Sequence, residues 1–362
     1  MSEKNKPSRG PKVGQPGLGT SPDGPQRWWR RPAFWLWLAL VLPLGLIAAH
    51  SVLWYVATQQ IIDQTTTQLR NLARQGWTTF ADVPVRGGYP WAAEVTTPGM
   101  RIAGPLLEWD AARVVVRLAL LQPRTVHIAI AGKQSARLGN SPLVPFSATR
   151  TEVEVDLATP DSSRIELDGL DAATPAGKLT AEAVRLRLDR AALTLNLDLT
   201  NAVLPDLRPD LPPDWPLSHT LEYAGLDVTV QGGAPVELTA PALKAWRAGN
   251  GQIDIPRLSV GWDKLKLAGH LTVSLDELLQ PNLAGQIRLG GYNSLIDALI
   301  ATNLLAPRPA QAMRAVLGML ARPAADTGPD SVDLPVTLRD RSLDVGRIPL
   351  LRTPEFVWPA GK

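Results

Sequence analysis

The sequence predicts a mainly β (α+β) fold: curved antiparallel sheets with one apolar face, a C-terminal helical hairpin packed on that face, and an N-terminal transmembrane helix. Three observations lead to this prediction. The 362 residues include 33 prolines and 29 glycines, which interrupt helices and favour short elements joined by turns. From residue 77 onward, apolar and polar residues alternate with period two, as in half-buried strands. Residues 33–56 contain no charged side chain.

Residues 1–32 are expected to form a disordered basic cytoplasmic tail, because they are rich in Pro, Gly, Ser and Lys and have little to bury. They carry seven basic and two acidic side chains, which leaves 30 basic and 32 acidic ones for the rest of the chain. The globular part therefore lacks the positive charge of a nucleic-acid-binding surface. The absence of cysteine excludes disulfides, thiolate metal sites and cysteine nucleophiles.

Residues 33–56 are predicted to be a transmembrane helix of about 36 Å, enough to cross a hydrocarbon core of about 30 Å. Basic residues immediately before this span place the N-terminus in the cytoplasm and the large domain outside it. The length of the apolar run favours an uncleaved anchor over the alternative, a cleaved signal peptide. The predicted anchor and interface residues are the basic and aromatic side chains at the ends of the span: Arg30, Arg31, Trp28, Trp29, Trp35, Trp37, Trp54 and Tyr55.

Helical spacing continues through residues 57–76, and Gly76 is expected to end this extension. A β-rich domain then occupies residues 77–355, with an alternative internal boundary at the Pro-rich residues 204–216, and residues 356–362 form a tail. Strands are expected at residues 78–87, 91–102, 106–121, 124–130, 151–157, 164–167, 179–188, 193–199, 221–230, 252–260, 265–275, 283–289, 331–339 and 342–350. The first two ranges are expected to be short strands, broken at Pro84, Gly87-Gly88, Pro90 and Pro98-Gly99.

A hydrophobic surface is predicted from the alternation within these strands. In residues 193–199 every second residue is leucine and the residues between are polar, which indicates a sheet with one dry and one wet face. Tryptophans are expected mainly in the core, with a ligand groove as the alternative. The candidate surface comprises Leu193, Leu195, Leu197, Leu199, Trp109, Trp246 and Trp262.

Helical patterns follow two of the strands. A short helix is expected at residues 241–248. A helical hairpin is expected at residues 293–322, divided at Pro307 and Pro309, with an apolar stripe to bury. Ser294 and Asp297 have the spacing of a capping box at its start.

A family resemblance rests on the stretches PALKAWRAGNGQIDIPRLSVGWDKLKLAGHLTVSL, GGYNSLIDALIATNLL and VDLPVTLRDRSLDVGRIPLLRTP, with Gln75-Gly76-Trp77 and VPVRGGYPWAAEV. On these motifs most of residues 50–355 resembles the family catalogued as domain of unknown function 2125 (DUF2125). The resemblance implies a membrane-anchored envelope protein of Gram-negative bacteria, hence a single-pass inner-membrane protein whose large domain lies in the periplasm. It implies no site, because the motifs are turns and strand edges. Arg341 stands where we expect glycine, so the turn type stays open.

No catalytic signature is present. The four histidines, His50, His127, His219 and His270, show no metal-ligand spacing. Glu152, Glu154 and Asp156 share one strand face, as do Arg185 and Arg187. Such carboxylates can bind a cation or serve acid–base chemistry. The interpretation we favour is pairing between strands on a solvated face, so no metal or other cofactor is expected.

The predicted apolar sheet face leads to the functional expectation. Left partly uncovered, it could take a lipid acyl chain or another hydrophobic ligand. The strands are also distantly similar to large envelope-assembly proteins whose long sheets curl into a lipid-lined groove. The alternative is a structural or assembly factor that contacts other envelope proteins, and an enzyme ranks third. The membrane is the expected partner, with lipid or an envelope protein besides, and the oligomeric state stays open.

Overall fold

The computed structural model describes residues 32–104, 107–121, 123–139, 141–205, 215–235, 237–302, 305–322, 330–346 and 348–359. The chain divides into two units, Met1–Val52 and Leu53–Lys362. The described part of the first unit is helical throughout. The second unit contains a long sheet and the remaining helices.

Helix α1 (Pro32–Arg74) begins in the first unit and ends in the second. By length and composition it could cross a membrane, and the side chains of Trp35 and Trp37 on it are exposed. At its C-terminus Gly76 takes a φ of 87°, and the amide of Trp77 donates to the carbonyl of Leu72 at 3.1 Å. This backbone arrangement is a Schellman motif, so the predicted stop at Gly76 is confirmed.

The rest of the fold is dominated by strands that form one sheet. They are β1 (Thr78–Ala81), β2 (Val85–Gly87), β3 (Ala92–Ala103), β4 (Leu107–Ala119), β5 (Thr125–Leu138), β6 (Val144–Ser147), β7 (Arg150–Asp156), β8 (Ser162–Thr174), β9 (Gly177–Asp189), β10 (Thr194–Val203), β11 (Thr220–Gln231), β12 (Gln252–Trp262), β13 (Leu265–Leu275), β14 (Pro281–Gly290), β15 (Ser331–Arg339), β16 (Ser342–Val345) and β17 (Ile348–Arg352).

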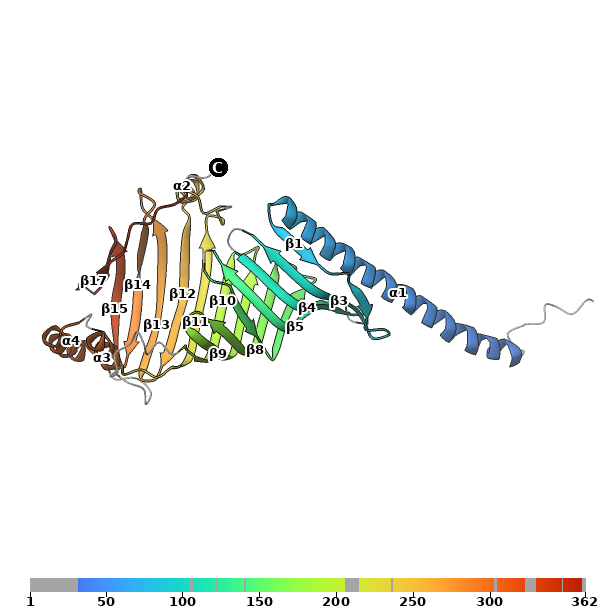
Figure 1. Cartoon of the computed structure of the whole chain (residues 1–362), viewed down its shortest axis with the longest axis horizontal. Helices are drawn as coiled ribbons and strands as arrows, with labels where there is room; N and C mark the ends of the chain where they lie inside the picture. The colour runs from blue at the N-terminus through green and yellow to red at the C-terminus, as the bar shows by residue number, and fades with distance from the viewer. Residues whose placement is uncertain are drawn as a thin grey trace, which may run out of the picture. The chain divides into compact units, whose positions relative to one another are not determined.

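The sheet is antiparallel and follows chain order. Strands β1 and β2 both pair with β3, and β6 and β7 both connect β5 to β8. From β8 to β17 every strand pairs with the next. The strand direction turns gradually between the steep β13–β15 and the diagonal β3–β5 (Figure 1), as the right-handed twist of strands requires. The predicted β architecture therefore forms a single long sheet.

Packed clusters of buried side chains lie near the two ends of this sheet. At one end, Ala57 and Thr58 of α1 and Ala93 of β3 are buried, and Ala57 and Ala93 share a cluster with Leu120. At the other end, Ile296 of helix α3 (Tyr292–Ala301) packs with Leu289 and Val332. Helix α4 (Pro307–Leu320) joins that cluster, whereas α2 (Ala240–Ala248) follows β11.

The alternation of apolar residues changes phase within several strands. Met100 of β3 and Ala111 of β4 cluster with Val114 and with Ile128 of β5. Gly99, with a φ of 84°, lies between Met100 and the earlier apolar residues of β3. The predicted break at Pro98-Gly99 is wrong, because β3 continues through both residues. Gly132 in β5, Gly169 in β8 and Asn201 in β10 also take positive φ. At such a residue the alternation of side chains shifts by one position. The apolar residues that follow it therefore still point to the same face of the sheet as those before it.

Four details differ from the sequence prediction. Helix α3 begins at Tyr292 after Gly291, with no side-chain cap, so the capping box is wrong and Asp297 instead pairs with Arg314 of α4. The predicted strand at residues 342–350 is divided into β16 and β17. Strands β5 and β8 run beyond their predicted ends because the chain stays extended past Gly132 and Gly169. Strand β6 was not predicted.

The two remaining boundaries concern the Pro-rich segment and the C-terminal residues. Residues 206–214 lie outside the described residues, and the strands that flank this segment, β10 and β11, pair directly. Near the C-terminus, Phe356 stacks on Trp358 at 6.1 Å between ring centroids. The indole of Trp358 donates to the carbonyl of Leu279 at 2.8 Å.

We predict that Arg341→Gly stabilises the domain. Asp340 and Arg341 take φ values of 50° and 67° in the two-residue turn between the paired Arg339 and Ser342, and glycine adopts this conformation without steric penalty. The unfolding free energy should rise by about 0.5–1 kcal/mol, measured by urea unfolding of the detergent-solubilised chain. Arg339→Gly, in the extended strand, is the control and should lower it. A loss of stability in Arg341→Gly would contradict the turn assignment.

Candidate functional site

A continuous row of apolar residues crosses the sheet from β3 to β15. Each member lies directly opposite the next in the strand register, so the row is defined by backbone pairing. We call it the central apolar row: Val95, Val116, Ile128, Val153, Ile165, Leu186, Leu197, Leu226, Leu258, Gly269, Ile287 and Leu334.

A second row runs beside it and reinforces the apolar face. Its members are Leu167, Val184, Leu199, Ala224, Val260, Leu267, Leu289 and Val332, again joined by direct cross-strand pairs. Cross-strand apolar pairs each contribute roughly 0.2–1 kcal/mol to sheet stability. The same side chains therefore hold neighbouring strands in register and form a broad apolar surface.

Burial along the central apolar row differs between its ends and its middle. Val95 is 3% exposed next to α1, and in the second row Val332 is 1% exposed next to α3. The members from Val153 to Leu258 are only half-buried, and none of them belongs to a packed cluster of the described residues. Between β7 and β12 the apolar face thus keeps access to solvent over about 24 Å, at 4.8 Å per strand.

A cavity of about 350 Å³ lies at the β3 end of the central apolar row. Ile62 and Leu69 of α1 line one side of it, and Val95, Met100 and Val116 of the sheet line the other. Two members of the row, Val95 and Val116, are therefore part of its wall. The row leads into a mainly apolar hollow beside the helix, whose lining also includes Asp82 and three threonines.

One polar contact lies within this apolar face. The indole of Trp109 donates to Oε1 of Gln134 at 3.3 Å, and Nε2 of Gln134 donates to the hydroxyl of Thr151 at 3.3 Å. Gln134 and Thr151 are buried. Buried polar groups without partners destabilise a fold. These two hydrogen bonds therefore allow the side-chain amide of Gln134 to be buried within the apolar face.

The opposite face carries a row of charged residues in matching register. Glu94, Arg117, His127, Glu154, Arg164, Arg187, Asn196, Asp227 and Arg257 lie opposite one another in succession. Arg117 pairs with Glu94 at 2.7 Å, and Arg257 pairs with Asp227 at 2.7 Å. The hydrogen bond from Arg257 is the main cause that lowers the pKa of Asp227. Pairs of this kind each contribute up to about 1 kcal/mol.

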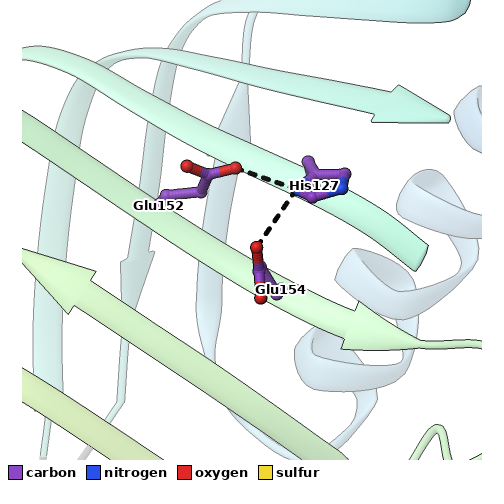
Figure 2. A group of neighbouring side chains, drawn as sticks. All are labelled: His127, Glu152 and Glu154. Carbon is purple, nitrogen blue, oxygen red and sulfur yellow. Dashed lines mark hydrogen bonds and ion pairs between the residues drawn. The ribbon is translucent and has the colours of Figure 1, made fainter. Parts of the chain in front are cut away.

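His127, Glu152 and Glu154 form the one group of possible metal ligands found among the described residues. Figure 2 shows the imidazole of His127 on β5 between the two carboxylates of β7. Its Nδ1 lies 2.8 Å from Oε1 of Glu152 and 3.5 Å from Oε1 of Glu154. Glu152 also pairs with Arg150, and Glu154 with Arg164. The arrangement is satisfied by these ion pairs, as expected for a solvated sheet face.

A polar hollow of about 470 Å³ lies on the middle strands of this charged face, beside the β7–β8 and β9–β10 turns. Its lining includes Glu154, Arg164, Arg187, Asp189 and Asn196. Burial raises the pKa of Glu152 in the adjoining ion-pair group, but the hydrogen bonds from Arg150 and His127 outweigh burial and lower it overall. The carboxylate of Glu152 is therefore held in the charged form, which suits ion pairing better than proton transfer at neutral pH.

The predicted hydrophobic surface is only partly brought together. Leu195, Leu197 and Leu199 lie half-buried on β10, whereas Leu193 precedes the strand with a φ of 52°. The three tryptophans lie in different places: Trp109 on β4, Trp246 buried on α2, and Trp262 beside Trp215 in the α3 cluster.

The predicted membrane-interface residues divide in the same way. Trp28, Trp29, Arg30 and Arg31 lie outside the described residues. Trp54 donates its indole N–H to the carbonyl of Gly87 at 3.1 Å, and Arg86 lies over the ring of Tyr55 at 4.8 Å.

One apolar surface formed by Val153, Ile165, Leu186, Leu226 and Leu258 was not predicted from the sequence. The sequence shows only the alternation within each separate strand, and this alternation does not reveal how the strands align.

The comparisons with known proteins give one match. The family model described as an uncharacterized protein conserved in bacteria (DUF2125) matches residues 54–354. No curated protein and no solved structure gives a significant match. The matched range includes the whole central apolar row and excludes most of the apolar run at residues 33–56.

We predict that Glu152→Gln destabilises the domain in a pH-dependent way. Since the pKa of Glu152 is lowered in the folded state, its stabilising contribution is present above the ordinary pKa of about 4.3 and is lost as pH falls through the lowered value. Urea unfolding should show a deficit of about 0.5–1 kcal/mol at pH 7 that shrinks at pH 3. Glu277→Gln, a side chain 91% exposed, should be neutral. A deficit that grows with acidification would contradict this prediction.

Proposed function

The chain belongs to the DUF2125 family, and we propose that it is a non-enzymatic inner-membrane protein that binds lipid acyl chains on a periplasmic domain. Helix α1 serves as an uncleaved single-pass anchor, with the basic N-terminus in the cytoplasm. The curved sheet offers its apolar face as the binding surface. The physiological role that fits this activity is maintenance of the bacterial envelope.

The half-buried middle of the central apolar row is the observation that carries the proposal. From Val153 to Leu258 it extends over about 24 Å. One leaflet of a bilayer core is roughly 15 Å thick, so an acyl chain lying across the strands would fit within this length. Each methylene removed from water contributes about 0.8 kcal/mol. A chain of ordinary lipid length would therefore gain enough to be held reversibly.

The cavity beside α1 supports the same proposal. It lies where the central apolar row reaches the helix, and its lining combines Ile62 and Leu69 with Val95 and Val116. Its volume of about 350 Å³ lies near the lower end of the range for small-molecule sites. A lipid chain could therefore enter the row at the end that is nearest to the anchor.

The competing proposal, an assembly factor that contacts other envelope proteins, uses the same surfaces differently. A partner protein could lie on the apolar face or add a strand to an edge of the sheet. No contact among the described residues favours a particular protein partner over lipid. Lipid remains the proposal because the central apolar row and the second row make a continuous apolar strip across neighbouring strands, which suits a chain without side groups.

We predict that the domain is labelled from the periplasmic side. The native chain has no cysteine, so Leu278→Cys, at a side chain 79% exposed, gives a single labelling site. A maleimide that crosses the outer but not the inner membrane should label this variant in intact cells, and should label Ser2→Cys only after permeabilisation. The opposite pattern would overturn the orientation.

We predict that lipid contacts one face of β10. A photo-crosslinking residue, p-benzoylphenylalanine, in place of Leu197 should give lipid adducts when cells are irradiated and the purified protein is examined by intact mass spectrometry. The matched control replaces Asn196, the preceding residue on the charged face, and should give none. Protein adducts at Leu197 alone would favour the assembly factor, and equal lipid adducts at both positions would contradict a binding face.

A further inference from the structure

Exposed aromatic and aliphatic side chains gather where α1 enters the second unit. Tyr55 on α1 is 53% exposed, Tyr89 and Trp91 between β2 and β3 are 48% and 76% exposed, and Leu121 after β4 is 79% exposed. We call these four residues the apolar collar. They come from the helix and from two turns at the same end of the strands. Residues far apart in the sequence are therefore brought together by the tertiary structure.

Contacts made by neighbouring residues hold the collar residues in place. Trp54 packs edge-on against Tyr89 with 5.6 Å between ring centroids, and its indole N–H donates to Gly87. Leu120 packs with Ala57 and Ala93, and its amide donates to the carbonyl of Trp91 at 3.5 Å. In Figure 1 the strands β1 and β3 lie beside α1. The turns are therefore fixed at the helical level of residues 54–57.

This level is also where the apolar run of the sequence ends. Residues 33–56 have no charged side chain, and the polar Thr58, Gln59 and Gln60 follow Ala57 on the helix. Tyrosine and tryptophan are enriched at the two membrane–water interfaces because one end of each ring is apolar and the other is polar. An anchor that spans the bilayer up to residue 56 would bring the collar to the level of the lipid headgroups.

The charges near the collar fit the same surface. The guanidinium of Arg86 lies over the ring of Tyr55 and bonds to Gln59. Arg124, in the turn that carries Leu121, is exposed. Basic side chains at this depth are attracted to anionic headgroups. Aromatic rings, leucine and arginine together match a bilayer interface.

We propose that the apolar collar inserts into the outer leaflet of the membrane that α1 spans. The strand ends at the β2–β3 and β4–β5 turns then lie on the bilayer surface. This proposal rests on the anchor in the proposed function and goes beyond it, because it adds a second contact with the membrane. Two contacts fix the orientation of the domain, whereas a single helix would leave it free to tilt. The near ends of the apolar strands would then face the lipid.

The test uses the full chain, reconstituted in vesicles of phosphatidylcholine and phosphatidylglycerol, with one nitroxide spin label on a single introduced cysteine. Leu121→Cys probes the collar. Leu138→Cys is the matched control, because Leu138 is 69% exposed and ends β5, the strand that follows the turn of Leu121, about 43 Å from the start of that strand. Trp91→Cys provides an independent collar site if the first variant folds poorly.

The expected result is several-fold lower collision of the label with a water-soluble nickel chelate at residue 121 than at residue 138, and higher collision with oxygen. Residue 91 should behave as residue 121 does. Equal nickel accessibility at the collar and control sites would overturn the proposal. Carbonate washing separates this failure from failure of the anchor: a chain that stays with the vesicles while the collar is aqueous refutes the collar alone, and a released chain refutes the anchor.

Discussion

Cross-strand register is the constraint on which the rest of this structure depends. Because side chains alternate with a period of two, a slip of one residue in any pair would move the apolar set of a strand to the other face. The pairs that join Val153, Ile165, Leu186, Leu197 and Leu226 exclude such slips, since each leucine or isoleucine meets another apolar residue. The charged row on the opposite face obeys the same register, so one alignment satisfies both faces.

A single sheet with two such faces places different chemistry on each side. The charged face is occupied by its own ion pairs: Arg257 bonds to Asp198 and Asp227 at 2.8 and 2.7 Å, and His127 bonds to Glu152. Those groups have little left to offer a substrate. Side chains on the apolar face cannot be removed from water by pairing with one another. Their hydrophobic burial and dispersion contacts require a second apolar surface packed on the face. Among the described residues, helices pack on the apolar face near the two ends of the sheet.

Most strands could be predicted from the sequence, but the register between neighbouring strands could not. Strands β13 and β15 fall at their predicted bounds, and Gly76 ends α1 as expected, because alternation and a left-handed glycine are local signals. Register is not local, so the central apolar row could not be assembled from the chain. The strand predicted at residues 164–167 is shorter than β8, because the alternation of apolar and polar residues does not continue past Gly169. For α3, the pattern at Ser294 was local but the helix starts earlier, where Gly291 provides the turn.

Small residues explain how α1 and the sheet meet closely beside the apolar face. Ala57, Thr58 and Ala93 are almost completely buried, and a larger side chain at any of them would push α1 away from β3. Further along the same helix, the contact opens into the cavity lined by Ile62 and Leu69. Close packing near residue 57 therefore positions the helix, and the looser packing one to three turns later leaves space. A lipid that reached this space from the membrane would find the central apolar row as its continuation.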